Sequence, residues 1–227
     1  MGKVIVISGG SDGIGKEIAR RMAKENKVII LSPTKPKLEL AAKELGCDFA
    51  VCDVRDFNEC KETISSIVKK NKRIDCLINC AGLWIEGKLE DNDPESIKRV
   101  IDVNLLGTIY LCKAVIPVMK SQKTGTIVNI SSQAGLYADK EREVYNATKF
   151  GVSGFTKGLE LELIGYGIRV IGVYPGKVNT KLFEKTGVKK SMGNAIEPEE
   201  VAKVVDFVVS LKDTTLIPEV GIRYTGN

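Results

Sequence analysis

The chain alternates short apolar runs with amphipathic stretches, and this alternation restricts its fold more than any other feature. Short runs, most of them rich in Val and Ile, predict strands over Val4–Ser8, Val28–Ser32, Asp48–Val51, Cys76–Asn79, Thr126–Ile130, Arg169–Tyr174 and Val220–Tyr224. The intervening patterns predict helices over Ile14–Lys24, Lys37–Leu45, Phe57–Lys70, Pro94–Met119, Tyr145–Ile164 and Pro198–Ser210. Strands that alternate with helices are typical of a parallel sheet covered on both faces, with right-handed crossovers. We therefore expect an α/β fold with a doubly wound parallel sheet of about seven strands.

No internal repeat, low-complexity tract or linker divides the chain, so residues 1–227 are expected to form a single domain. Pro117 lies near the end of the helix predicted over Pro94–Met119 and is expected to bend or stop it. The sequence has no run of about 18 or more apolar residues, which argues against a membrane span. The apolar segment at its start is interrupted by Gly9-Gly10 and is too short for a signal peptide, so a cytoplasmic protein is expected.

The composition excludes several classes of function. The chain has 34 Lys and Arg against 29 Asp and Glu, a net charge of +5 without a basic arm, so nucleic acid is not expected as a partner. It contains no histidine, which excludes every mechanism that needs an imidazole as base or ligand. Its 6 cysteines show no C-x-x-C spacing, so we expect thiols rather than disulfides and no metal site.

A glycine-rich turn follows the first predicted strand directly. It reads Ser8-Gly9-Gly10-Ser11-Asp12-Gly13-Ile14-Gly15, and a helix follows. Gly9 allows the sharp turn, Gly13 a close approach of a pyrophosphate, and Gly15 close packing of helix on sheet. The free amides and the dipole of such a helix attract phosphate. Because the turn joins the first strand and helix of a βαβ unit, it predicts a dinucleotide site in a Rossmann fold.

The G-x-x-x-G-x-G spacing resembles the short-chain dehydrogenase/reductase family, whose fingerprint is T-G-x-x-x-G-x-G, with Ser8 in place of the threonine. Further matches follow in the family's order along nearly the whole chain. They are Asp53 after the third strand, Asn79-Cys80-Ala81-Gly82 in place of N-N-A-G, Asn104, Ser132, Tyr145-Asn146-Ala147-Thr148-Lys149 as Y-x-x-x-K, and Pro175-Gly176. Together these motifs are highly specific, although each is weak alone.

The resemblance implies a set of residues that bind a nicotinamide cofactor. These are Ser8, Gly9, Ser11, Asp12, Gly13, Ile14, Gly15, Ser32, Asp53, Val54, Asn79, Ala81, Gly82, Tyr145, Lys149, Pro175, Gly176, Val178 and Thr180. Asp53 would bind the adenine, and Val178 and Thr180 would contact the carboxamide.

Tyr145 and Lys149 lie four residues apart on a predicted helix and therefore share a face. A tyrosine hydroxyl ordinarily has a pKa near 10, and a nearby ammonium would lower that pKa by about 2–3. The resemblance implies that Tyr145 is the general acid in carbonyl reduction and the general base in alcohol oxidation. It also implies that Lys149 holds the nicotinamide ribose, that Ser132 binds the substrate oxygen, and that Asn104 anchors a water linked to Lys149.

The second strand bears on the choice between NADP and NAD. An NAD enzyme of this fold usually has an acid at its end, where Ser32 stands here. Ser32, Thr34, Lys35 and Lys37 could bind a 2′-phosphate, whereas Pro33 replaces the arginine typical of NADP enzymes and Asp12 weighs mildly against phosphate. We expect NADP(H) to be preferred over NAD(H).

The expected activity is hydride transfer between NADP(H) and a small carbonyl compound or secondary alcohol. A short substrate lid is expected at about 181–194, where Lys181, Lys185, Lys189 and Lys190 face Glu184 alone. The favoured explanation of these lysines is a solvated amphipathic helix. They also leave open a 3-oxoacyl-[acyl-carrier-protein] reductase, in which they would meet an acidic carrier. A nucleotide-sensing or scaffold protein without turnover is the alternative of another class. By the same resemblance, a homodimer or homotetramer is expected.

Overall fold

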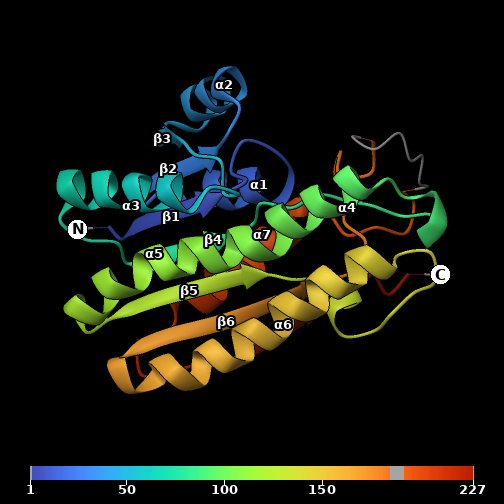
Figure 1. Ribbon diagram of the computed structural model, residues 1–227. Helices are drawn as coiled ribbons and strands as arrows, with labels where there is room; N and C mark the ends of the chain where they lie inside the picture. The colour runs from blue at the N-terminus through green and yellow to red at the C-terminus, as the bar shows by residue number, and fades with distance from the viewer. Residues whose placement is uncertain (1, 185–191, 227) are drawn as a thin grey trace.

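The computed structural model describes residues 2–184 and 192–226. Its seven-stranded sheet is parallel throughout, with the strand order β3-β2-β1-β4-β5-β6-β7 (Figure 1). The strands are β1 Val4–Ser8, β2 Lys27–Ser32, β3 Asp48–Val51, β4 Cys76–Asn79, β5 Gly125–Ile130, β6 Ile168–Pro175 and β7 Glu219–Ile222. The order reverses between β1 and β4, which makes this the doubly wound fold expected from the alternation of strands and helices.

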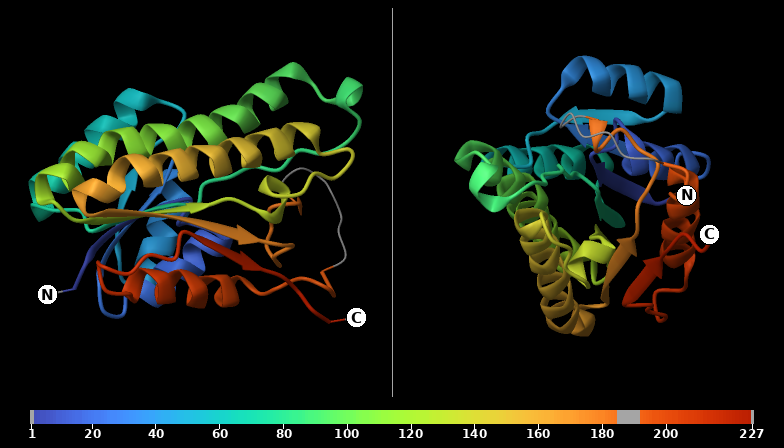
Figure 2. Two further views of the ribbon diagram at one scale, coloured as in Figure 1. Left: turned by 90° about the horizontal axis from the view of Figure 1, so that it is seen from below. Right: turned by 90° about the vertical axis from the view of Figure 1, so that its right-hand side faces the viewer.

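Helices cover both faces of this sheet, as the left view of Figure 2 shows. One face carries α1 Gly13–Met22, α2 Lys35–Leu45 and α7 Pro198–Ser210, and the other carries α3 Phe57–Asn71, α5 Gly107–Gln122 and α6 Glu143–Leu163. A shorter helix, α4 Pro94–Ile101, packs against α6. Both layers leave the carboxyl ends of the strands open at one edge of the sheet.

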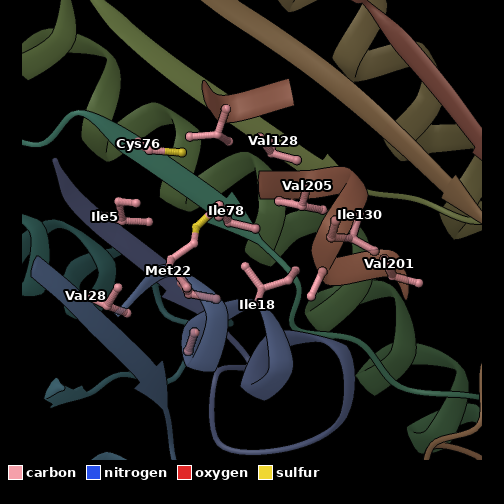
Figure 3. Close-up of a cluster of buried hydrophobic side chains, with 14 of the residues drawn as sticks. Ile5, Ile18, Met22, Val28, Cys76, Ile78, Val128, Ile130, Val201 and Val205 are labelled. Atoms are coloured by element: carbon pink, nitrogen blue, oxygen red, sulfur yellow. The ribbon is translucent and has the colours of Figure 1, made fainter. Parts of the chain in front are cut away.

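Strand β1 shows why the sheet has two cores. All five of its residues are buried, with Ile5 and Ile7 in one hydrophobic cluster and Val4 and Val6 in the other, because successive side chains point to opposite faces. Figure 3 shows the first cluster, in which Ile5 of β1 lies near Met22 of α1, and Val201 and Val205 of α7 belong to the same cluster. Each fully buried aliphatic side chain of this size contributes about 1.5–3 kcal/mol. A continuous apolar run, rather than an alternating one, therefore predicts a strand that is buried on both faces, such as β1.

The stretch predicted as one helix over Pro94–Met119 is interrupted. The helix α4 ends at Ile101, a π-helical turn spans Asp102–Leu106, and α5 follows. Pro117 lies inside α5 and does not stop it, since the helix continues to Gln122. Proline removes a single backbone hydrogen bond, and the burial of Val115 and Met119 beside it offsets that loss. Of the two expected effects, a bend or a stop, the stop at Pro117 does not occur.

Several predicted ends also shift. The helix α1 begins at Gly13 rather than Ile14, because Asp12 caps it by accepting a hydrogen bond from the Gly13 amide, and it ends at Met22. The helices α2 and α6 begin two residues before their predicted starts, at Lys35 and Glu143. Strand β7 covers Glu219–Ile222, the length over which it pairs with β6.

Within the described residues, one helical stretch, Pro94–Gln122, has the length and mean hydropathy (1.5) of a membrane span. Its inner face is a core surface, where Leu111, Cys112 and Val115 are fully buried under the sheet. A core helix of a water-soluble protein has the same properties, so this stretch is weak evidence for a membrane.

Candidate active site

Two adjoining cavities open at the carboxyl ends of the strands. The first, of about 330 Å³, is lined by residues that follow β1, β2, β3, β4 and β5. The second, of about 740 Å³, lies against the loops that follow β5 and β6. Tyr145 and Thr180 line both cavities. In open α/β sheets ligands bind at this edge, where the strand order reverses.

The glycine-rich turn forms the floor of the first cavity. Gly9 has φ +69°, and a Cβ there would lie 2.8 Å from the backbone of Ala81. A Cβ on Gly15 would lie 2.4 Å from the carbonyl oxygen of Gly9. Both positions therefore require glycine. The first turn of α1, with Gly13, Ile14 and Gly15, lines the cavity, and the N-terminus of a helix attracts phosphate.

Ser8 ties this turn to the next strand. Its Oγ accepts hydrogen bonds from the amides of Cys80 and Ala81, at 3.1 and 3.3 Å. Asn79, one residue earlier, is buried and donates through Nδ2 to Oδ1 of Asn129 at 2.8 Å. Neither Ser8 nor Asn79 lines a cavity, so both hold the ends of β1 and β4 in place beneath the predicted site.

The residues present fit a nicotinamide dinucleotide. The first cavity is lined by the glycine-rich turn, by Asp53 and Val54, and by Ala81 and Gly82, all predicted cofactor residues. Its lining carries more positive than negative side chains, with Lys37, Arg55, Arg99, Lys149 and Lys181 against Asp12 and Asp53. An elongated, basic cavity over a helix N-terminus suits a dinucleotide with its phosphate charges.

Ser32, Pro33, Thr34 and Lys37 lie together along the part of this cavity that follows β2. The Oγ of Ser32 accepts from the amide of Thr34 at 3.4 Å, and no carboxylate follows β2 before Glu39. Lys35, the other predicted phosphate ligand, does not line the cavity, since it points to Glu39 at 3.7 Å. Of the two lysines predicted to bind a 2′-phosphate, Lys37 is the one that lines the cavity.

Asp53 lies in the cavity, but its carboxylate is already engaged. The guanidinium of Arg55 contacts it at 2.6 Å and holds its pKa below the ordinary value. Sequence reasoning had missed Arg55 and Arg99, which also line the cavity. The sequence could have indicated Arg55, because it lies two residues after Asp53. Nothing in the sequence indicates Arg99, which comes from α4.

Tyr145 and Lys149 lie on one face of α6, as their spacing predicts. Both are nearly fully buried, with exposed fractions of 6% each. The ammonium of Lys149 donates to the carbonyl of Ile130 at 3.0 Å and lies 5.8 Å from the centroid of the Tyr145 ring. The end of β5 therefore holds the lysine beside the phenol.

The expected lowering of the pKa of Tyr145 does not occur in the protein alone. Burial raises the pKa of Tyr145 to about 12, and a hydrogen bond with Ser132 and the charge of Arg142 act weakly in the other direction. Burial also lowers the pKa of Lys149 to about 8, which reduces its power to stabilise a phenolate. A neutral phenol is nevertheless the form that donates a proton to a carbonyl oxygen.

Asn104 occupies the π-helical turn between α4 and α5. Its Oδ1 accepts from the amide of Leu83 at 2.7 Å, and its Nδ2 donates to the carbonyl of Leu83 at 3.0 Å and to Oγ1 of Thr148 at 3.2 Å. A Cβ added at Gly82 would lie 3.7 Å from Oδ1 of Asn104 and 4.0 Å from Nζ of Lys149. The two side chains therefore converge at Gly82. The π-turn, a form that is frequent at functional sites, makes this possible.

The two serines after β5 have different surroundings. Ser131 lines both cavities, but it is buried and its Oγ donates to the carbonyl of Lys149 at 3.1 Å. Ser132 lines the second cavity, where its Oγ accepts from the amide of Ala134 at 3.1 Å. Of the two, Ser132 is placed to meet a ligand beside Tyr145, in agreement with the 13-residue spacing.

The second cavity has an apolar side and a polar side. Pro175, Gly176 and Val178, predicted to contact the cofactor, line it rather than the first cavity. Its apolar walls include Trp84, Leu182 and Phe183, and its charged residues are Asp139, Arg142 and Lys177. The side chain of Lys177 contacts Oδ1 of Asn194.

Of the predicted lid, Lys185, Lys189 and Lys190 lie outside the described residues. All 6 cysteines are free thiols, and no cluster of metal-ligating side chains occurs in the described part of the chain.

Comparison with known proteins decides the family. The family model for short-chain dehydrogenases matches residues 3–191. The chain belongs to the short-chain dehydrogenase family. An uncharacterised oxidoreductase of Staphylococcus saprophyticus is 33% identical, over 97% of this chain and 97% of that protein. The 3-oxoacyl-[acyl-carrier-protein] reductase of Thermotoga maritima is 36% identical, over 92% of this chain and 91% of the other.

The same family includes a solved structure described as the closed form of serine dehydrogenase complexed with NADP+. It has a TM-score of 0.91 and 30% identity, and the match covers 96% of this chain and 94% of that one. The chain is therefore an oxidoreductase with the fold of NADP-binding short-chain dehydrogenases.

Proposed function

We propose that this short-chain dehydrogenase reduces the carbonyl group of a small molecule with NADPH and, in reverse, oxidises a secondary alcohol. The observation that carries the proposal is the position of Tyr145, which lines both the first cavity, proposed to hold the dinucleotide, and the second cavity. A phenol at this boundary can exchange a proton with a substrate oxygen, while the nicotinamide, when bound, supplies or accepts the hydride.

Each site residue has one task in this proposal. Tyr145 gives its proton to the carbonyl oxygen in reduction and takes it back in oxidation. Ser132 donates a hydrogen bond to that oxygen as negative charge develops. Lys149 holds the nicotinamide ribose and stabilises the phenolate that reduction leaves behind, and Asn104, which converges with it at Gly82, anchors a water that returns a proton.

NADP(H) is proposed over NAD(H) on the absence of an acid at the end of β2 and the position of Lys37 in the cavity. The NADP+ in the serine dehydrogenase relative supports the same choice.

Self-association into a dimer or tetramer is proposed as well. Helix α6 exposes Phe150 and Leu161 at 44% and 75%, and Ile101 lies exposed on the neighbouring α4. Apolar side chains of this size on adjacent helices suit an interface. We place such an enzyme in the cytoplasm, acting without nucleic acid or membrane.

The test is consumption of NADPH, and in parallel NADH, over a panel of aldehydes, ketones and 3-oxoacyl thioesters, with Tyr145→Phe as the control. Turnover that Tyr145→Phe reduces several hundredfold (on the order of 10²–10⁴ for a general acid) establishes the reductase. Tight NADPH binding without turnover on any substrate would instead favour a nucleotide sensor, and binding of neither dinucleotide would refute the proposal.

A 3-oxoacyl-[acyl-carrier-protein] reductase is the second candidate, favoured by the relative in Thermotoga maritima. Its specific requirement is recognition of an acidic carrier by basic residues such as Lys181. Activity on a carrier-linked substrate that falls with rising salt, while activity on the free thioester does not, separates this candidate from a small-carbonyl reductase.

A further inference from the structure

Trp84 is the single tryptophan of the chain and lies directly against Tyr145. The two ring centroids are 4.4 Å apart and the rings are tilted by 53°. A second ring, Phe183, meets the indole edge-on at 4.8 Å and 82°. Trp84 is 6% exposed and forms part of the wall of the second cavity. Trp84 therefore packs between Phe183 and Tyr145, whose phenol the proposed reaction uses.

Asn104, in the π-helical turn, holds the backbone before Trp84. Asn104 binds both the amide and the carbonyl of Leu83, at 2.7 and 3.0 Å. These bonds place the loop after β4 but leave the orientation of the next side chain to its own contacts. Those contacts decide how the indole lies on Tyr145.

Arg142 lies over the indole, with its Cζ 5.4 Å from the ring centroid. Two carboxylates hold the guanidinium there, since Nη1 contacts Asp139 at 2.5 Å and Nε lies 3.8 Å from Glu86. The amide of Gly87 also donates to the carbonyl of Glu141 at 2.8 Å. Arg142 directly precedes α6, three positions before Tyr145, and its side chain makes no capping hydrogen bond there. The loop after β4 is thus joined to the start of the helix that carries the phenol.

This arrangement constrains the Tyr145 ring from two directions. Trp84 packs against it from the loop after β4, and Lys149 lies beside it on α6. The phenol must point its oxygen at the boundary between the two cavities, and a misplacement of about 1 Å of a reacting group can cost about 100-fold in rate. Contacts on two sides of the ring therefore limit such a displacement.

We propose that Trp84, oriented by Arg142, is a positioning residue that holds the Tyr145 ring in its reacting orientation. The proposal rests on the reductase activity proposed above. Trp84 acts through Tyr145, so its loss lowers kcat and leaves dinucleotide affinity unchanged. A side chain that only filled the core would lower stability and leave the kcat of the folded enzyme unchanged.

The experiment compares Trp84→Leu, Trp84→Phe and Arg142→Met with the wild type, using the best substrate of the panel. Arg20→Met is the matched control, because Arg20 also contacts two carboxylates, Glu17 and Glu44, but lies on the outer surface of α1. We expect Trp84→Leu to lower kcat about tenfold, the fold-change that corresponds to a lost aromatic pair. Trp84→Phe, which keeps a ring, should recover kcat to within about threefold of the wild type.

Fluorescence gives a readout that does not depend on turnover. Because Trp84 is the single tryptophan, its emission reports this site alone, and bound NADPH should quench it by energy transfer to the reduced nicotinamide. Arg142→Met is expected to shift the Trp84 emission towards longer wavelength and to lower kcat about threefold, since the cation over the indole is lost. Arg20→Met should change neither.

The outcomes test the positioning role of Trp84 separately from the proposed reductase activity. A wild type that turns over, with the same kcat in folded Trp84→Leu, overturns the positioning role alone. If Trp84→Leu does not fold, Arg142→Met decides, and an unchanged kcat and emission in that variant overturn the role. A wild type that shows neither quenching by NADPH nor turnover overturns the proposed function and this inference together.

Discussion

The ammonium of Lys149 lies 5.8 Å from the centroid of the Tyr145 ring and donates to the carbonyl of Ile130 at 3.0 Å, away from water. Burial lowers the pKa of Lys149 to about 8 and raises that of Tyr145 to about 12. Both shifts favour the neutral forms, because burial disfavours charge. The protein alone therefore keeps the phenol protonated, which is the form that the proposed carbonyl reduction needs.

Lys149 should make stability depend on pH in a defined window. Between its folded pKa of about 8 and the ordinary 10.5, the unfolded chain holds a proton that the folded chain releases. The free energy of unfolding should therefore rise with pH over this window, by about 3 kcal/mol in total. Urea unfolding of the wild type and of Lys149→Met at pH 7 and pH 10 measures this effect. The free energy of unfolding of the wild type should increase relative to that of the variant between the two pH values.

The control for this measurement is Lys69→Met on the exposed side of α3, which should show no such change between the two pH values. An equal difference between wild type and Lys149→Met at both pH values would contradict the assigned pKa. Lys149→Met is also expected to abolish measurable turnover, because the proposed mechanism requires the ammonium.

Asn104 should couple energetically to Thr148. Its Nδ2 donates to Oγ1 of Thr148 at 3.2 Å, and both groups are buried. Asn104→Ala should destabilise the protein by about 2 kcal/mol, since the amide and carbonyl of Leu83 lose their partner. A double-mutant cycle with Thr148→Val should give a coupling of about 1 kcal/mol. Asn58→Ala on exposed α3 serves as the control, and strict additivity of the two variants would argue against the contact.

Ser32→Asp should reverse the cofactor preference. A carboxylate at this position would accept the ribose 2′-hydroxyl of NADH and repel a 2′-phosphate. We expect kcat/KM for NADPH to fall at least 30-fold or so, since like charges in contact cost several kcal/mol, while the value for NADH rises. Ser65→Asp on exposed α3 adds the same charge elsewhere and should leave both values unchanged. An unaltered ratio in Ser32→Asp would place the 2′-phosphate elsewhere.

Arg169 should support the C-terminal end of α7. It is 4% exposed and donates to the carbonyls of Val208 and Val209 in α7 at 3.5 Å. It also donates to the carbonyl of Thr215 at 3.0 Å and to Oγ1 of Thr126 at 2.9 Å. Arg169→Met leaves these buried acceptors without a donor, so we expect a loss of about 3 kcal/mol in urea unfolding. Arg21→Met breaks the exposed ion pair with Asp206 and should cost less than about 1 kcal/mol. Equal costs would show that the buried contacts add nothing.

Local sequence patterns were sufficient to predict secondary structure where a single physical requirement decides which residue types can occur. The run Val4–Ser8 and the glycines that follow it predict strand, turn and helix correctly, because a strand buried on both faces needs continuous apolar residues and the turn leaves no room for a Cβ. The interruption of the helix at Asp102–Leu106 was not predictable. It goes together with the contact of Asn104 with Leu83, 21 residues away in the chain, and spacing within one segment does not reveal such a contact.

Sequence alone determined the fold class, the dinucleotide turn and the shared face of Tyr145 and Lys149, since each follows from residues a few positions apart. The tertiary structure decided the rest: the engagement of Asp53 by Arg55, the direction of the pKa of Tyr145 and the stack of Arg142 on Trp84. These depend on burial and on partners brought together from different loops. Spacing within one segment carries no information about how deeply a group is removed from water or which distant charge meets it.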